Sequence, residues 1–182
     1  VQIRRVTGVK MSASTSGTNS VLVQIPDGYQ KVPEGLGFTD RLQPFYRRII
    51  DDEVSFGFIV GDQHLNSMGI CHGGALMTLA DVAAAASLYH RRKTPGRMPT
   101  VNLSCDFVSA ARAGRWVHSK ADHVEPKKRF GFCSGAVYDG EQLLLRYSGT
   151  YYLTTPTASD QAQGVERSEA QQRLATLMGD VS

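Results

Sequence analysis

The pattern of apolar and polar positions changes several times along the chain, and each change marks a predicted element. Residues 1–32 are mixed and rich in Ser, Thr and Gly, and "SASTSGTNS" within them predicts a loop. The next segment, "PEGLGFTDRLQPFYRRII" at 33–50, predicts a loop and then a short helix capped by Thr39 or Asp40. "EVSFGFIV" at 53–60 is rich in β-branched and aromatic residues, which predicts a strand.

A long apolar segment from Gly74 to Leu88 predicts a buried helix. Six alanines lie between positions 75 and 86, and alanine is the best helix former. Because this helix is apolar on nearly all sides, it must be covered by other elements. "RRKTPGRMP" ends it, with cations at the negative end of the helix dipole and a Pro-Gly break.

The segments after this helix predict four strands and a polar tail. "TVNLSCDFV" at 100–108 alternates, and the last three strands form an antiparallel meander over 115–124, 129–139 and 141–153. One long apolar helix with an antiparallel sheet predicts the α+β class, with the sheet wrapped around the helix. "RSEAQQRLATLMGD" in the tail can form a terminal helix capped by Ser168.

Length and composition are those of a single ordinary domain. The chain has 182 residues, and no apolar run approaches the roughly 18 residues of a membrane span. The first residues lack the apolar core and cleavage site of a secretion signal. Three widely spaced cysteines, Cys71, Cys105 and Cys133, do not fit a disulfide framework or a zinc ribbon. We therefore expect reduced, mostly buried thiols in a cytoplasmic protein that crosses no membrane.

The net charge of +3 is slight, and the basic residues gather in three clusters at 46–49, 90–93 and 126–129. None of the clusters forms the aromatic-studded basic stripe of a nucleic-acid binder, so we expect no nucleic-acid partner. Each cluster is either a solvated helix end or turn, or a site for a small ligand that carries phosphate.

Candidate chemistry gathers at the start of the long helix. Asp81 is the only charged side chain between His72 and Tyr89, and a buried Asp is rare unless it is paired. It lies on a wetted edge of the helix, or it acts as a catalytic base or nucleophile. Gly73 and Gly74 let a ligand approach the first helical N–H groups, which could polarise a carbonyl; a Gly-rich turn without a ligand is the alternative.

Three polar residues lead into the same helix end. The Asn66 amide can orient a water or a carbonyl, or Asn66 is an ordinary loop residue. His64 is expected at the surface. His72 is either a general acid or a residue that holds the loop through its ring nitrogens. The spacing of His64, Cys71 and His72 is not that of a zinc site, so we expect no metal.

Taken together, these residues fill the pattern H-x-N-x-x-G-x-x-H-G-G-x-x-x-x-L-A-D. The pattern closely resembles that of the hotdog-fold acyl-CoA thioesterases of the phenylacetyl-CoA thioesterase-like (PaaI-type) group, over about residues 50–153. The positions that carry the resemblance are His64, Asn66, Gly69, His72, Gly73, Gly74, Leu79, Ala80 and Asp81.

The resemblance implies a hotdog fold and an active site at a homodimer interface, with dimers that pair again into tetramers. Asp81 would be the base or nucleophile and would face His72 and Gly73 of the other chain. The Gly73 amide would polarise the thioester carbonyl, Asn66 would position the carbonyl or water, and Thr100 would supply a hydroxyl near the carboxylate.

The resemblance also implies the substrate and the extent of the domain. The ligand would be an acyl-CoA, whose coenzyme is part of the substrate, so no separate cofactor is expected. Gly74 and His64 would line its site, and Lys127, Lys128 and Arg129 would meet its phosphates. The hotdog domain would span residues 41–153, between an N-terminal extension at 1–40 and a tail at 154–182.

Two other functions stay open. Dehydratases and hydratases that act on acyl thioesters share the fold, but they use a catalytic His beside an Asp or Glu, and the H-G-G-x(6)-D spacing departs from that pattern. A non-catalytic acyl-CoA sensor is the third interpretation, although the two tails do not resemble a DNA-binding segment. No G-x-S-x-G nucleophile elbow is present.

Overall fold

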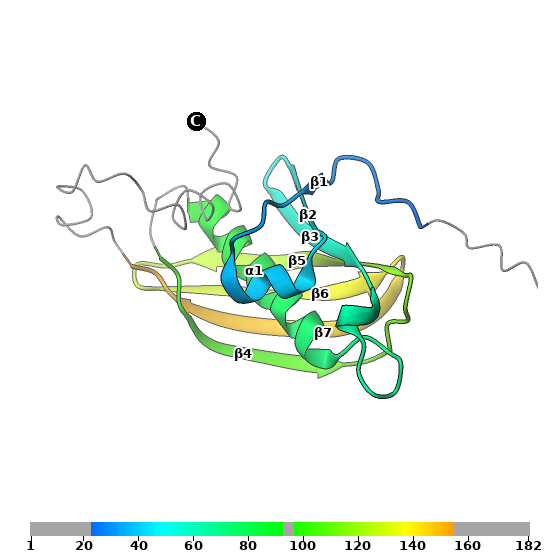
Figure 1. The fold of residues 1–182 in the computed structure, drawn as a ribbon. Coiled ribbons are helices and arrows are strands. Elements are labelled where there is room, and N and C mark those ends of the chain that lie inside the picture. Colours follow the sequence, from blue (N-terminus) through cyan, green and yellow to red (C-terminus); the bar gives the residue numbers. More distant parts are fainter. Residues whose placement is uncertain (1–22, 93–96, 155–182) are drawn as a thin grey trace, which may run out of the picture.

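We analysed a computed structural model, which describes residues 23–92 and 97–154. One antiparallel sheet of seven strands, in the order β1-β2-β3-β5-β6-β7-β4, curves around a single long helix, α1 (Figure 1). This arrangement confirms the predicted α+β class. The strands are β1 (Gln30–Lys31), β2 (Phe45–Ile50), β3 (Glu53–Ile59), β4 (Thr100–Phe107), β5 (Trp116–Pro126), β6 (Phe130–Asp139) and β7 (Gln142–Tyr152).

The central helix α1 (Gly73–Arg92) is longer than predicted, because it continues through the basic residues at its carboxyl end. Its buried side points at the sheet and carries Leu76, Leu79, Ala80 and Leu88. The expectation that the helix is covered on all sides is wrong. Asp81 lies on a side of the helix that the described residues cover only in part.

The predicted short helix within residues 33–50 is also wrong. Only a 3₁₀ turn, η1 (Gly37–Leu42), forms, and the residues after it make strand β2. The aromatic pair at the start of this segment and the two isoleucines at its end suit a strand, and pairing of β2 with β3 across the turn at Asp51 decides between helix and strand. Asp40 caps no following helix, because its carboxylate accepts from the Gly35 and Leu36 amides before it.

The other strands agree with the sequence predictions. Strands β5, β6 and β7 form the expected meander, and β4 pairs with β7 at the sheet's far edge. The predicted terminal helix at 167–180 lies outside the described residues. All three cysteines are free thiols. Burial raises the pKa of the Cys71 thiol to about 11 and that of Cys133 to about 12, as expected for unreactive core thiols.

Candidate active site

The start of α1 is held by the residue before it. The His72 Nδ1 atom accepts a hydrogen bond of 2.8 Å from the Gly74 amide, so the imidazole caps the helix. This bond is the one expected of a loop-holding His72, and the general-acid role stays a prediction. It also occupies the Gly74 N–H, which leaves Gly73 as the donor of interest. Among the residues that the structure describes, the Gly73 amide donates to none.

The loop before the helix is built around Asn66. Its side-chain oxygen accepts from the Met68 amide at 2.9 Å, and its backbone N–H and C=O bond to Ile70 and Gly69. The amide nitrogen of Asn66 is bonded to no group in the described part of the chain, so it is available as a donor. Bridges of this loop to Cys71 and Arg112 tie it to the core.

His64 lies in the core, so the expected surface position is wrong. Its exposed fraction is 2%, its ring packs on Phe58 with centroids 4.4 Å apart, and its Nδ1 atom accepts from the Gly61 amide. Burial lowers the pKa of this imidazole, which keeps it neutral at pH 7. A side chain in this position supports the loop from within the core, and its assignment as a substrate-binding residue stays a prediction.

Asp81 is anchored by two hydroxyl groups. Thr100, the first residue of β4, donates to Asp81 Oδ1 at 2.8 Å, and the Tyr151 hydroxyl donates to the same oxygen at 3.0 Å. Tyr151 is fully buried on β7, and its hydroxyl also lies 3.3 Å from the Asp81 carbonyl oxygen. Burial, and then the Asp81 charge, raise the pKa of Tyr151 above its ordinary value, so the hydroxyl stays protonated and donating.

The carboxylate opens into a cleft of about 390 Å³. The cleft is apolar except at the Asp81 carboxylate and the threonine hydroxyl groups in its lining, of which Thr100 bonds to Asp81. A site of this size, with a few polar groups in an apolar wall, is typical of small-molecule binding. Its lining residues are Phe38, Thr39, Met77, Thr78, Asp81, Val82, Thr100 and Leu103.

Two of these groups are not evident from the sequence. Tyr151 is 70 residues from Asp81 along the chain, and its neighbours give it no distinguishing pattern. Phe38 belongs to a segment assigned to the N-terminal extension, and η1 carries it onto α1.

The basic turn between β5 and β6 stands at the end of the sheet where β4 begins. Lys127, Lys128 and Arg129 are all exposed. Lys127 pairs with Glu125, and the Arg129 guanidinium lies 5.9 Å from the Tyr152 ring. Tyr152 follows Tyr151 in the strand and points to the opposite face of the sheet. The turn therefore does not touch Asp81.

Metal-binding clusters and membrane-spanning helices are absent from residues 23–92 and 97–154. No group of three or more His, Cys, Asp or Glu side chains there could hold a metal ion. In the same residues, no helix has both the length and the apolar character needed to cross a membrane.

Comparisons with known proteins agree with the fold and the motif. Residues 68–145 match the family model described as the thioesterase superfamily. A Pseudomonas aeruginosa protein that is provisionally named esterase PA0474 is 33% identical over 135 residues, which cover 72% of this chain and 99% of the relative.

Solved structures share the fold. A mutant of the phenylacetic acid degradation protein PaaI from Thermus thermophilus has a TM-score of 0.57 and 24% identity, over 64% of this chain and 98% of that one. A hypothetical thioesterase from Streptococcus pneumoniae, solved with coenzyme A, has a TM-score of 0.57 and 16% identity, over 70% of this chain and 96% of that one.

The resemblance drawn from the histidine, glycine and aspartate motif is thus confirmed by a sequence relative, a family model and the fold. The family model covers the motif from Gly69 to Asp81, whereas His64 and Asn66 lie just before the matched residues. The chain belongs to the thioesterase superfamily, and it has the hotdog fold that this superfamily shares.

Proposed function

We propose that this chain hydrolyses an acyl-CoA thioester to the free acid and coenzyme A. The observation that carries the proposal is Asp81, a carboxylate in an apolar cleft with one oxygen held by two hydroxyl donors. Because Thr100 and Tyr151 both bind Oδ1, the carboxylate is fixed in orientation and its Oδ2 atom is left for chemistry. Thioester hydrolysis at neutral pH needs such an aimed base or nucleophile.

In the hydrolysis, Asp81 takes a proton from water, and the water oxygen forms a bond to the thioester carbonyl carbon. The carbonyl oxygen becomes an oxyanion, which the unpartnered Gly73 amide at the positive end of α1 stabilises. Collapse of the adduct breaks the carbon–sulfur bond, and the coenzyme A thiolate takes up the proton. Direct attack by Asp81, to give an anhydride that water then opens, uses the same groups.

The other motif residues assist this chemistry. His72 holds the first turn of α1 in place, so that the Gly73 amide points outward. The free amide nitrogen of Asn66 donates to the carbonyl or to the water from the adjoining loop. Lys127, Lys128 and Arg129 are exposed cations suited to the phosphates of coenzyme A.

The proposal requires two copies of the chain. Gly73 and Asp81 are eight residues apart on one helix, which separates them by about 12 Å along its axis. One carbonyl cannot meet both groups of the same chain, so Asp81 acts with Gly73 of a partner. Strand β4 offers a surface for the pairing, since in the described residues it is bonded on one side only. Its residues Val101 and Phe107, and Val108 directly after it, are more than half exposed.

Two further sequence predictions join this proposal. Pairing of the dimers into tetramers, and a cytoplasmic location where acyl-CoA is available, remain predictions. The coenzyme A bound by the Streptococcus pneumoniae thioesterase is consistent with the proposed substrate.

Release of free thiol from a panel of short, long and aromatic acyl-CoAs tests the proposal, with wild type beside Asp81→Asn. We expect turnover by the variant to be lower by about 10²-fold or more, which is the usual contribution of a positioned base. Asp27→Asn is the matched control, because this acid is exposed in the turn before β1, at the edge of the sheet opposite β4, and does not line the cleft. Circular dichroism establishes that each variant is folded.

The other outcomes separate the alternatives. Absence of thiol release by wild type across the whole panel contradicts acyl-CoA hydrolysis. Addition of water to an unsaturated acyl-CoA would then identify a hydratase, and binding without turnover would identify a sensor. Equal turnover by wild type and Asp81→Asn would remove Asp81 from the mechanism.

A further inference from the structure

The segment of residues 32–43, here called the η1 arm, crosses the open side of α1 beside the cleft (Figure 1). Two buried side chains anchor it to the core, Val32 near its start and Leu42 near its end. Between these anchors the chain bulges outward through η1, and Phe38 and Thr39 reach the wall of the cleft that holds Asp81. The arm is thus a local loop with fixed ends.

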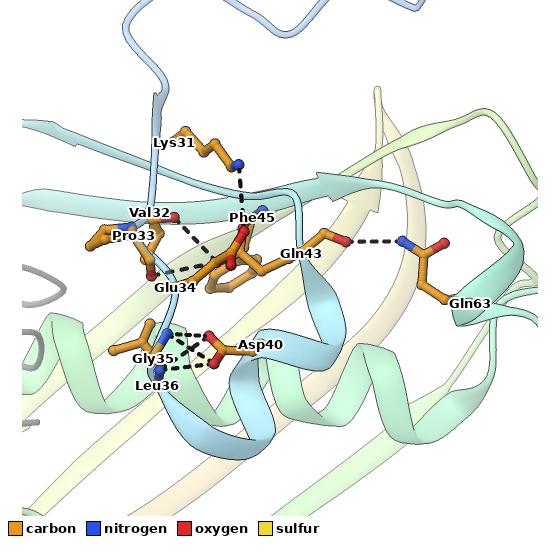
Figure 2. Close-up of polar contacts among 10 residues, drawn as sticks. All are labelled: Lys31, Val32, Pro33, Glu34, Gly35, Leu36, Asp40, Gln43, Phe45 and Gln63. Carbon is orange, nitrogen blue, oxygen red and sulfur yellow. Dashed lines mark hydrogen bonds and ion pairs between the residues drawn. The ribbon is translucent and has the colours of Figure 1, made fainter.

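Polar bonds hold the arm in one shape (Figure 2). The Asp40 carboxylate accepts from the Gly35 amide at 2.9 Å and from the Leu36 amide at 3.1 Å, which closes the loop around η1. Bonds from an ionised group to amides are about twice as strong as neutral ones. The arm is therefore pinned at its bend as well as at its buried anchors.

A second set of bonds fastens the end of the arm (Figure 2). The Gln43 side chain donates to the Val32 carbonyl at 3.2 Å and accepts from the Phe45 amide at 3.0 Å, so it ties the two ends of the arm together. Gln63 donates to the Gln43 carbonyl at 2.9 Å, which links the arm to the turn η2 (Asp62–His64). That turn leads into the loop before α1.

Phe38 is the side chain that this construction presents to the cleft. Its exposed fraction is 75%, the largest among the exposed large hydrophobic side chains of the described residues. Leaving a phenylalanine in water forgoes the stabilisation that its burial would bring. The arm nevertheless holds the Phe38 ring exposed in the cleft that contains Asp81. A bound ligand that covers the ring would explain this arrangement.

We propose that Phe38 is a specificity-determining residue that packs against the acyl group of the thioester. This inference rests on the proposed function. With the carbonyl at Asp81 and Thr100, the acyl body extends between Phe38 on one wall and Met77, Val82 and Leu103 on the other. Aromatic and thioether side chains contact apolar groups of many shapes, so the cleft selects acyl groups with an apolar body over acetyl.

The test compares wild type and Phe38→Ala with acetyl-CoA and with acyl-CoAs of larger aliphatic and aromatic body. We expect kcat/KM for the larger acyl groups to fall about tenfold because KM rises, while the kinetic constants for acetyl-CoA stay unchanged. Phe38→Leu should recover most of the loss, because it restores apolar contact. Phe132→Ala is the matched control, since this phenylalanine is exposed but does not line the cleft.

A second measurement does not need turnover. Calorimetry with thioether analogues, in which a methylene separates the carbonyl from the sulfur, reports binding alone. We expect the large-bodied analogues to bind Phe38→Ala about tenfold more weakly, with coenzyme A itself unaffected. Asp40→Ala frees the Gly35 and Leu36 amides and keeps the phenylalanine. This variant should also bind the large-bodied analogues more weakly than wild type does.

The results distinguish this inference from the proposed function. If wild type hydrolyses acyl-CoAs and Phe38→Ala changes all of them equally, the thioesterase proposal stands and the role of Phe38 is overturned. If wild type hydrolyses none but binds the large-bodied analogues through Phe38, the cleft is an acyl-binding site and the hydrolysis proposal fails. Binding of the analogues that is equal in wild type and Phe38→Ala overturns the inference whatever the turnover.

Discussion

At the scale of single residues, the feature that matters most is the convergence of two hydroxyl groups on one oxygen of Asp81. Thr100 stands at the exposed start of β4, whereas Tyr151 is buried in the core beneath the helix. The two donors come from adjacent strands, so the carboxylate orientation depends on the sheet and on α1 together. A base held in this way loses little entropy when the substrate arrives.

Removal of the Tyr151 hydroxyl should therefore lower turnover without weakening substrate binding. For Tyr151→Phe we expect kcat to fall about tenfold and KM to stay within about twofold, because one bond to the charged carboxylate is lost. Steady-state kinetics on the best acyl-CoA make the measurement. Tyr147→Phe removes another buried tyrosine hydroxyl from β7 that does not bond Asp81, and it should leave kcat unchanged. An equal loss in both variants would point to a structural role.

His64 gives the fold a pH dependence. Burial lowers its pKa below the ordinary value of about 6.5, so in mildly acidic solution the unfolded chain binds a proton that the folded chain does not. The contribution of neutral His64 to the free energy of unfolding is therefore fully present above pH 6.5. It is lost as the pH falls toward the pKa that His64 has in the folded chain. Urea unfolding between pH 7.5 and 5 should show this decline, and His64→Gln should flatten it. An equal decline in the variant would show that other groups cause the pH dependence. His118 is one such group, because burial lowers its pKa as well.

At the scale of elements, the first turn of α1 combines a cap with a free amide. His72 satisfies the Gly74 N–H, whereas the Gly73 N–H has no hydrogen-bond partner among the described residues, so the helix keeps one donor at its positive end. Gly73 also leaves room for the Phe107 ring, because a Cβ at this position would meet the ring at 3.0 Å. The element is therefore shaped both for an exposed N–H and for the close approach of a neighbouring side chain.

Gly73→Pro should test the amide directly. Proline is tolerated at the first helical position, where it removes only an N–H that has no helical partner. We expect helix content by circular dichroism to be unchanged and kcat to fall about 10²-fold, as when an oxyanion donor is lost. Gly73→Ala adds a Cβ but keeps the N–H, so it measures the contact with Phe107 alone. Similar activity in the two variants would show that the amide is not the donor.

At the scale of the whole molecule, the proposed site needs two chains. The Gly73 amide and Asp81 lie on the same helix about 12 Å apart along its axis, and β4 leaves an apolar edge at the end of the sheet. A two-fold symmetric pair would bring each Asp81 to the partner's helix start and would form two equal sites.

Mixing of two inactive variants tests this shared site. A heterodimer of Asp81→Asn and Gly73→Pro chains has one site with both changes and one with neither. We expect heterodimers purified through two different tags to recover about half of the wild-type turnover per dimer, because symmetry gives each dimer two sites. Homodimers of either variant should remain inactive. Heterodimers as inactive as the parents would indicate that each chain completes its own site.

Much of this molecule follows from local patterns. The alanine-rich run predicts α1, and the alternating segments from residue 100 onward predict β4 and the meander, because helix and strand periods are properties of neighbouring residues. The motif from His64 to Asp81 predicts the family and the residues that line the helix start, since these lie close together along the chain.

Tertiary structure decided what depends on contacts between distant segments. Residues 45–50 form a strand because β3 pairs with them, and His64 is buried because Phe58 and the loop close over it. The sheet brings Tyr151 to Asp81 across 70 residues. The periodicity of neighbouring residues does not predict such long-range contacts. Their stability comes from burial and hydrogen bonds that exist only when the sheet and α1 have packed together.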